Sequence, residues 1–165
     1  ATLMVPFIVT ITPLFIIVKT LGWTNTYAGL IIPMMFSPFG TFLMRQFFLS
    51  SPRELEEAAT IDGANTLTTF FRIMLPLTGP AFATLGVLSI MGSWNNFLWP
   101  LLIVSNPKFM TLPVALSSLQ GIYPGQTDWN LIMAGAVINV LPMILVFLFA
   151  QRWVVEGVAA SGLKG

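Results

Sequence analysis

Acidic side chains are concentrated in one short segment of this chain. Four of its six Asp and Glu residues lie between positions 54 and 62. There, Glu57-Ala58-Ala59 is followed by Asp62 and Gly63, and the run Ile73-Met74-Leu75-Pro76 comes shortly after. Charge is thereby concentrated in one segment of a chain that is otherwise mostly uncharged, and Gly63 is placed to end a helix there. We expect this segment to bind a soluble partner protein.

A second group of residues combines aromatic rings with uncharged polar groups. Ser93, Asn95, Asn96 and Asn139 occur within long apolar stretches, and Trp94 and Trp99 flank the asparagine pair. An amide that faces lipid is unfavourable and usually turns inward. Aromatic faces and amide hydrogen bonds together bind sugars, which suggests a translocation path lined by Trp94, Asn95, Asn96 and Trp99. Alternatively, the tryptophans lie at the membrane interface and the asparagines join helices.

The composition excludes much other chemistry. The chain has no Cys and no His, so it lacks thiolate metal ligands, imidazole metal ligands and the usual proton shuttle at neutral pH. Its acidic residues lie in loops or at the ends of apolar stretches, whereas an intramembrane enzyme or an ion-driven carrier needs ionisable groups at membrane depth. We therefore predict no catalytic residue and no metal site. No segment matches G-x-x-x-x-G-K-[ST], so we predict no phosphate-binding loop of this type and no cofactor in this chain.

The composition predicts that most of this chain is surrounded by the lipid bilayer. It is 56% hydrophobic and only 8% charged, with a mean hydropathy of +0.86, whereas a soluble domain carries about 25% charged residues. A membrane helix needs about 20 mainly apolar residues. We predict four spans, near residues 3–18, 27–48, 81–104 and 131–150. The fold class is then an all-α, polytopic transmembrane helix bundle, with one domain over residues 1–165.

Basic residues indicate the orientation, because they favour the cytoplasmic side of short loops. On this topology five of the seven fall on one side: Arg45, Arg53, Arg72, Arg152 and Lys164. Lys19 and Lys108 fall on the other. We therefore predict a cytoplasmic loop over 49–79, a cytoplasmic tail over 151–165, and an external loop over 105–130 with a short helix after Thr111. The chain opens on apolar sequence without a charged flank, which we interpret as an N-terminal truncation.

Local signals predict a helix in the cytoplasmic loop. Ser51-Pro52-Arg53-Glu54 has the form of a capping box with Ser51 as N-cap. Gly63 is placed to end the helix in a left-handed conformation. Leu55, Ala58 and Ala59 share one face at helical spacing, a small apolar surface for another protein. The alternative is an amphipathic helix that lies on the membrane surface.

A second helix is expected to begin near Asn65 or Thr66 and to end before Pro76. Its apolar residues follow the spacing of a single stripe, which predicts that they are buried together against the base of the bundle. These residues are Leu67, Phe70, Phe71, Met74 and Leu75.

The segment Glu57-Ala58-Ala59, with Gly63 six residues after Glu57 and the Ile73-x-Leu75-Pro76 ending, resembles the "EAA" loop of permease subunits in ATP-binding-cassette importers. Further motifs resemble the maltose-type, MalG-like carbohydrate permeases and extend the likeness over essentially the whole chain. They are Ser93-Trp94-Asn95-Asn96-Phe97-Leu98-Trp99-Pro100, Thr111-Leu112-Pro113-Val114, Gln151-Arg152-Trp153-Val154-Val155-Glu156-Gly157 and Gly162-Leu163-Lys164-Gly165. Such permeases usually have six spans, so this chain would lack about the first two.

The resemblance implies a coupling helix that docks on an ATP-binding-cassette ATPase subunit, where ATP and magnesium are bound. Glu57 would pair with a basic residue of the ATPase, Ala58 and Ala59 would allow close approach, and Gly63 would make the turn. Asp62, Leu75 and Pro76 complete the predicted ATPase-coupling residues. The tail residues Gly162, Lys164 and Gly165 would also approach the ATPase, although such tails are often simply frayed.

The resemblance also implies a second permease subunit and an extracytoplasmic solute-binding protein as partners, with lipid around the spans and no nucleic acid. The external loop would contact the binding protein through Tyr123, Gln126 and Trp129, or serve as a solvated connector. The expected location is the prokaryotic cytoplasmic (inner) membrane, multi-pass. The implied function is sugar or oligosaccharide import by alternating access, without an ATPase site in this chain. Alternatives are a permease for another solute and a channel or carrier not driven by ATP.

Overall fold

The computed structural model describes residues 2–120 and 127–162, and all its regular elements there are helical. The predicted all-α class is therefore confirmed. The chain divides into two compact units: unit 1 comprises Ala1–Pro38 and Ile90–Val146, and unit 2 comprises Phe39–Ser89 and Phe147–Gly165. Each unit is described by itself below.

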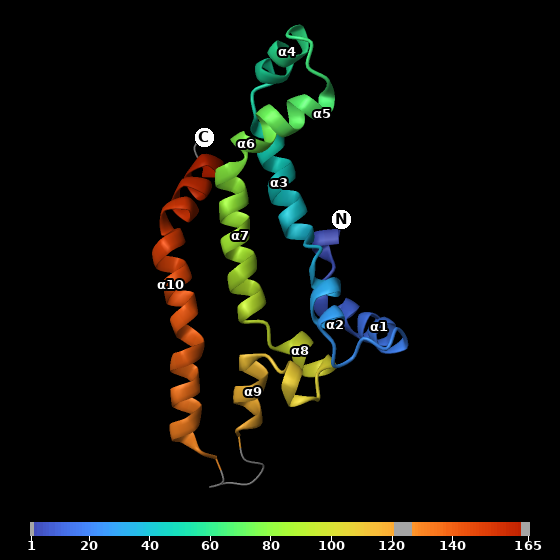
Figure 1. Cartoon of the computed structure of the whole chain (residues 1–165), viewed down its shortest axis with the longest axis vertical. Coiled ribbons are helices and arrows are strands. Elements are labelled where there is room, and N and C mark those ends of the chain that lie inside the picture. Colours follow the sequence, from blue (N-terminus) through green and yellow to red (C-terminus); the bar gives the residue numbers. More distant parts are fainter. Residues whose placement is uncertain (1, 121–126, 163–165) are drawn as a thin grey trace. The chain divides into compact units, whose positions relative to one another are not determined.

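Unit 1 contains short helices around one small core. Its elements, coloured from blue to orange in Figure 1, are η1 (Thr2–Met4), α1 (Phe7–Thr20), α2 (Tyr27–Ile31), η2 (Ile32–Met34), α8 (Leu98–Ile103), η4 (Pro107–Phe109), α9 (Leu112–Ser118) and the first part of α10 (Trp129–Gly162). Helix α8 packs against both α1 and α2. The core consists of Ile11, Val18, Trp99, Ile103 and Val104.

The Trp99 side chain and the Gly29 backbone lie in close contact at the edge of this core. The Trp99 indole is fully buried, and its Nε1 donates a hydrogen bond of 3.0 Å to the carbonyl oxygen of Gly29. A Cβ atom on Gly29 would collide with the carbonyl oxygen of Trp23, so this position requires glycine. The turn between α1 and α2 and the start of α2 are thereby held against α8.

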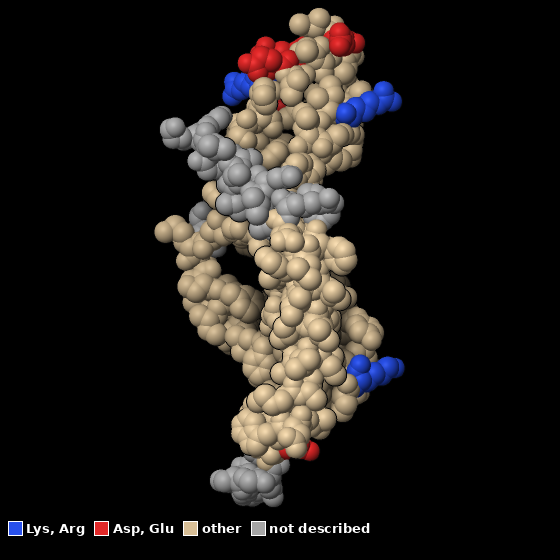
Figure 2. Space-filling model, turned by 90° about the vertical axis from the view of Figure 1, so that its left-hand side faces the viewer, with Lys and Arg blue, Asp and Glu red and all other residues tan. Residues whose placement is uncertain are grey.

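Unit 2 contains α3 (Pro38–Ser50), α4 (Glu54–Ile61), α5 (Thr66–Thr69), the π-helical stretch η3 (Phe70–Met74), α6 (Leu75–Leu77), most of α7 (Gly79–Trp94) and the end of α10. Charged side chains gather at the α4 end of this unit (Figure 2), whereas residues 129–151 of α10 contain no Asp, Glu, Lys or Arg. The predicted charged segment is therefore a distinct surface of unit 2.

Two helices are long and apolar enough to cross a membrane, Tyr27–Ser50 and Trp129–Gln151. A third span results if Thr66–Leu77 and Gly79–Trp94, bent by 67° at their junction, count as one. Two or three spans within the described residues thus replace the predicted four. Phe7–Thr20 has only 14 residues, about 21 Å of helix against a hydrocarbon core of about 30 Å.

The predicted span 81–104 is not one helix. Helix α7 ends at Trp94, and α8 begins only at Leu98 and packs into the core of unit 1. The side chain of Asn95 donates to the carbonyl oxygen of Met91 at 2.9 Å, within the last turn of α7. Such side-chain bonds to the backbone compete with helix continuation, a signal that hydropathy does not include.

Candidate functional site

Helix α4 has the composition and the C-terminal turn of a compact docking element. Its first turn holds Glu54, Glu56 and Glu57, and carboxylates there are favourable because the amino end of a helix is electropositive. Gly63 has φ 81°, its N–H donates to the Thr60 carbonyl at 3.0 Å, and the Ala64 N–H donates to the Ala59 carbonyl at 2.9 Å. This is a Schellman motif, and it confirms the predicted role of Gly63 in ending the helix.

The predicted capping box at the start of α4 is wrong. Arg53 is the N-cap residue and makes no side-chain cap hydrogen bond. The hydroxyl of Ser51 instead donates to the carbonyl oxygen of Phe47 at 3.2 Å, at the end of α3. A serine hydroxyl can bond to either flanking helix, and here the preceding helix holds it.

The two alanines of the acidic segment have different surroundings. Glu57 and Ala58 are exposed, whereas Ala59 is only 4% exposed. Leu55 and Ile61 are exposed, and so is Asp62. The expected common face of Leu55, Ala58 and Ala59 is therefore wrong for Ala59, which packs inside unit 2. The surface left for a partner combines the Glu57 carboxylate with the small Ala58 side chain.

The helix after Gly63 begins as predicted and ends later. The Asn65 side chain caps it, accepting a hydrogen bond of 2.8 Å from the Thr68 N–H. The helical path continues through η3 and α6 to Leu77, so the predicted end before Pro76 is wrong. After the wider turn of η3, α6 restarts at Leu75 and Pro76 falls in its first turn, where a missing N–H is tolerated.

The predicted buried stripe is wrong for most of its members. Leu67 and Phe71 are exposed, Phe70 is 39% exposed, and Leu75 is half-buried. Met74, at 5% exposure, is the only fully buried member of the stripe. A π-turn shifts only the side chains that follow it, so it does not account for Leu67, which lies in α5 before η3. Of the two coupling residues beyond it, Leu75 accepts a hydrogen bond from the Thr78 hydroxyl at 2.7 Å, and Pro76 is exposed.

The candidate translocation residues do not form one cluster. The indole Nε1 of Trp94 donates to the Asn139 carbonyl oxygen of α10 at 3.0 Å, and Asn95 bonds within its own helix. Trp99 lies in the core of unit 1. Only Asn96 of the four combines a partly exposed side chain with a position on a recess of about 370 Å³ in unit 1. Trp94 thus joins α7 to α10, a role that the alternative interpretation gave to the asparagines and not to the tryptophans.

Thr111 lies on the same recess, and sequence reasoning did not assign it a role. It is the N-cap residue of α9 but makes no side-chain cap hydrogen bond, and its Oγ1 is buried without a hydrogen-bond partner. A buried unsatisfied hydroxyl costs about 1–3 kcal/mol. The available signal was Pro113, whose missing N–H removes one of the two donors that an N-cap side chain usually bonds.

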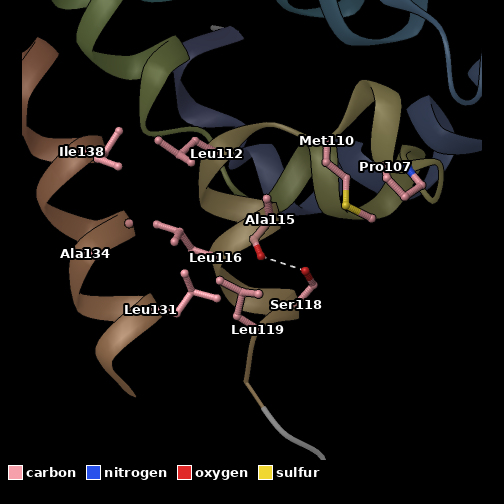
Figure 3. A pocket seen from close by; sticks show the side chains of 11 residues that line it. Pro107, Met110, Leu112, Ala115, Leu116, Ser118, Leu119, Leu131, Ala134 and Ile138 are labelled. Carbon is pink, nitrogen blue, oxygen red and sulfur yellow. Dashed lines mark hydrogen bonds between the residues drawn. The ribbon is translucent and has the colours of Figure 1, made fainter. Parts of the chain in front are cut away.

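A larger recess of about 520 Å³ lies between α9 and α10. Figure 3 shows Leu116 of α9 and Leu119, the C-cap residue of α9, opposite Leu131, Ala134 and Ile138 of α10. The Ser118 hydroxyl beside it donates to the Ala115 carbonyl oxygen at 2.7 Å. The recess therefore offers mainly apolar contact.

The remaining predicted contact residues are only partly described. Tyr123 and Gln126 lie outside the described residues, as do Lys164 and Gly165. Trp129, the first residue of α10, is 62% exposed, and Gly162 is the last residue of that helix. Within residues 2–120 and 127–162, no group of three or more His, Cys, Asp and Glu residues could hold a metal ion.

The chain belongs to the family of binding-protein-dependent transport system inner membrane components, whose model matches residues 1–160. It is 40% identical over 163 residues to the arabinooligosaccharides transport system permease protein AraQ of Bacillus subtilis, across 99% of this chain and 57% of that protein. It is 42% identical over 160 residues to the sn-glycerol-3-phosphate transport system permease protein UgpE of Pectobacterium atrosepticum, across 97% of this chain and 57% of that protein. The chain thus spans little more than half the length of these relatives.

A solved structure shares the fold. It is a crystal structure of a bacterial ABC transporter involved in the import of the acidic polysaccharide alginate. One of its chains superposes with a TM-score of 0.73 and 27% sequence identity, across 86% of this chain and 55% of that chain. The predicted resemblance to importer permeases is confirmed, and such family members are transport components of the membrane rather than enzymes.

Proposed function

We propose that this chain is part of the membrane subunit of an ATP-driven importer for sugars or oligosaccharides, which moves its solute by alternating access. The family match over residues 1–160 supports the class. The observation that carries the coupling role is helix α4, an acidic, solvent-exposed helix closed by a left-handed glycine within an otherwise apolar chain. A channel has no evident use for such an element.

ATP hydrolysis takes place, in this proposal, on separate ATP-binding-cassette subunits that hold ATP and magnesium. Glu57 pairs with a basic residue of the ATPase, and Ala58 permits the close approach. An exposed ion pair contributes little by itself, but one enclosed in a docking cleft orients the interface and is costly to break on one side. Asp62, Leu75 and Pro76 support the turn and the helix behind this contact.

The proposed orientation places unit 2's loop and the C-terminus in the cytoplasm. Arg45, Arg53 and Arg72 belong to unit 2, whereas Lys19 and Lys108 belong to unit 1. This distribution supports a cytoplasmic α4 and an external α9 under the positive-inside rule. A second permease subunit would complete the path, and a solute-binding protein would dock on the outer side near Trp129.

The solute class is inferred from the relatives. Two of them are named for arabinooligosaccharides and sn-glycerol 3-phosphate, and the solved relative imports alginate. All three solutes are polyols or saccharides, so we assign a carbohydrate or a closely related polyol to this chain.

A pair of cysteine variants tests the docking role. The chain has no native cysteine, so Ala58→Cys and its neighbour Ala59→Cys can each carry a single photo-crosslinker in the full-length permease in native membranes. We expect Ala58→Cys, which is exposed, to capture an ATP-binding-cassette ATPase identified by mass spectrometry. Ala59→Cys, buried in unit 2, is the matched control and should capture little.

Capture of lipid alone from Ala58→Cys, with the protein inserted and labelled, would contradict the docking role. It would favour a helix that lies on the membrane surface, and a channel would then become the leading alternative.

A further inference from the structure

The recess that contains Asn96 is assembled from five parts of unit 1, one of which is α2 with Leu30 and Ile31. Met34 comes from η2, Ser93 and Asn96 come from the end of α7 and the turn after it, Pro100 comes from α8, and Thr111 begins α9. Its volume of about 370 Å³ exceeds one water-sized site many times over. Trp99 supports its wall from behind, since the indole is fully buried and bonded to Gly29.

Two polar side chains on this recess are open to a ligand, and a third polar group is buried beside it without a hydrogen-bond partner. The Thr111 Oγ1 atom is buried and has no hydrogen-bond partner, and its usual use in capping α9 is not made. The Asn96 side chain is partly exposed on the recess, and Ser93 is exposed. Hydroxyl and carboxamide groups both donate and accept hydrogen bonds. Asn95 differs, because its amide is already bonded to the Met91 carbonyl.

The rest of the lining selects against ions. Met34, Pro100 and Leu30 provide apolar surface, and none of the described residues that line the recess is charged. A phosphate or carboxylate ligand is normally recognised by Arg or Lys. A pyranose or furanose ring, in contrast, has apolar C–H faces and hydroxyls that both donate and accept.

We infer that this recess is a binding subsite for one unit of an uncharged saccharide, an assignment that rests on the proposed importer function. Thr111 and Asn96 bond the saccharide hydroxyls, Ser93 lies at the edge, and Met34 and Pro100 contact a ring face. The subsite favours neutral oligosaccharides over sn-glycerol 3-phosphate and over acidic polysaccharides, which divides the relatives' solutes into two classes.

The test uses the full-length permease assembled with its partner subunits in proteoliposomes. Ser93→Cys places a thiol on the recess, and Ser118→Cys, an exposed serine of α9 outside it, is the matched control. We expect arabinotriose or maltotriose to slow maleimide labelling of Ser93→Cys about threefold at twice the dissociation constant, because the free fraction is then about one third. Labelling of Ser118→Cys should not change, and sn-glycerol 3-phosphate or alginate oligosaccharides should protect neither thiol.

A second measurement uses Thr111→Val, which removes the hydroxyl at nearly constant volume. The half-saturating saccharide concentration for ATP-dependent uptake should rise about threefold to tenfold, as expected for one lost hydrogen bond. Thr10→Val, at an exposed threonine of α1 outside the recess, should leave it unchanged.

Three results would overturn the subsite: uptake of a neutral saccharide with no protection of Ser93→Cys, protection by the anionic solutes instead, or equal protection of both thiols. Absence of ATP-dependent uptake of every one of these solutes by the wild-type complex would be a different failure, because it would contradict the proposed function itself.

Discussion

Helices α1 and α4 are followed by the same type of C-terminal turn, but the segments after the two turns make different contacts. Gly22, with φ 69°, follows the C-cap residue of α1, and Gly63, with φ 81°, follows the C-cap residue of α4. In both, the glycine N–H and the next N–H donate to carbonyls of the last turn, which is the Schellman arrangement. A Cβ atom at either glycine would meet nothing within 4 Å. The backbone conformation alone requires glycine at both ends.

The chain beyond Gly22 is fastened to a distant part of unit 1. Asn25 has φ 56°, and its Oδ1 accepts hydrogen bonds from the Ser105 and Asn106 N–H groups at 2.8 and 2.7 Å. Its own N–H donates to the Ile103 carbonyl at 3.0 Å. The α1–α2 turn is thereby joined to the turn after α8.

Among the residues that the structure describes, the segment beyond Gly63 makes local hydrogen bonds instead. Asn65 bonds to Thr68, three residues away, and starts the next helix. The same type of turn is therefore followed in unit 1 by a segment bonded to distant residues. In unit 2 it is followed by a segment bonded to its near neighbours in sequence. An exposed turn is the one that suits docking on a partner protein.

The largest loss of stability is expected from removing the hydrogen bonds of the Asn25 side chain. Asn25→Ala loses two accepted hydrogen bonds and places alanine in a left-handed conformation, so we expect a loss of about 2–4 kcal/mol of stability. Asn25→Gly loses the same hydrogen bonds, but glycine adopts the left-handed backbone conformation without strain. Its loss of stability should therefore be about half that of Asn25→Ala. Hydrogen exchange followed by mass spectrometry on the purified complex should show faster exchange at Ser105 and Asn106 in both variants. Unchanged exchange there would mean that the fastening is not needed.

A matched pair of glycine variants distinguishes the role of the turn after α1 from that of the turn after α4. Gly22→Ala and Gly63→Ala should each cost about 1–2 kcal/mol, because alanine is strained at positive φ. Gly22→Ala should lower only the unfolding midpoint of the complex. Gly63→Ala should also lower the solute imported per ATP hydrolysed in proteoliposomes, because it disturbs the proposed docking turn. An equal loss of coupling in both variants would show that stability alone explains the effect.

The smallest effect on stability is expected at Glu57. Glu57→Ala removes an exposed carboxylate, so the free energy of unfolding should change by no more than about 0.5 kcal/mol. Import should nevertheless fall relative to ATP hydrolysis, because a basic group of the ATPase is left unpaired. Glu56→Ala, also exposed on α4, is the control. Full import by Glu57→Ala would rule out its coupling role.

Sequence reasoning succeeded where one local signal determines the outcome. The apolar composition indicates a membrane protein, Gly63 ends α4, and the following helix begins near Asn65 or Thr66 as expected. It failed where neighbours compete for a group: the Ser51 hydroxyl bonds to α3 rather than α4, and Pro76 is accommodated by a π-helical stretch that residue spacing does not reveal.

The sequence by itself therefore determined the membrane class, the helical content and the C-terminal end of the acidic helix, since these depend on composition and on residues within one turn. Only the tertiary structure decided that Trp99 is a core residue, that Trp94 joins two helices, and that Thr111 and Asn96 share a recess. Those outcomes depend on pairs such as Trp99 and Gly29, 70 residues apart, which are brought together by the packing of α8 on α1 and α2. No short stretch of sequence contains that information.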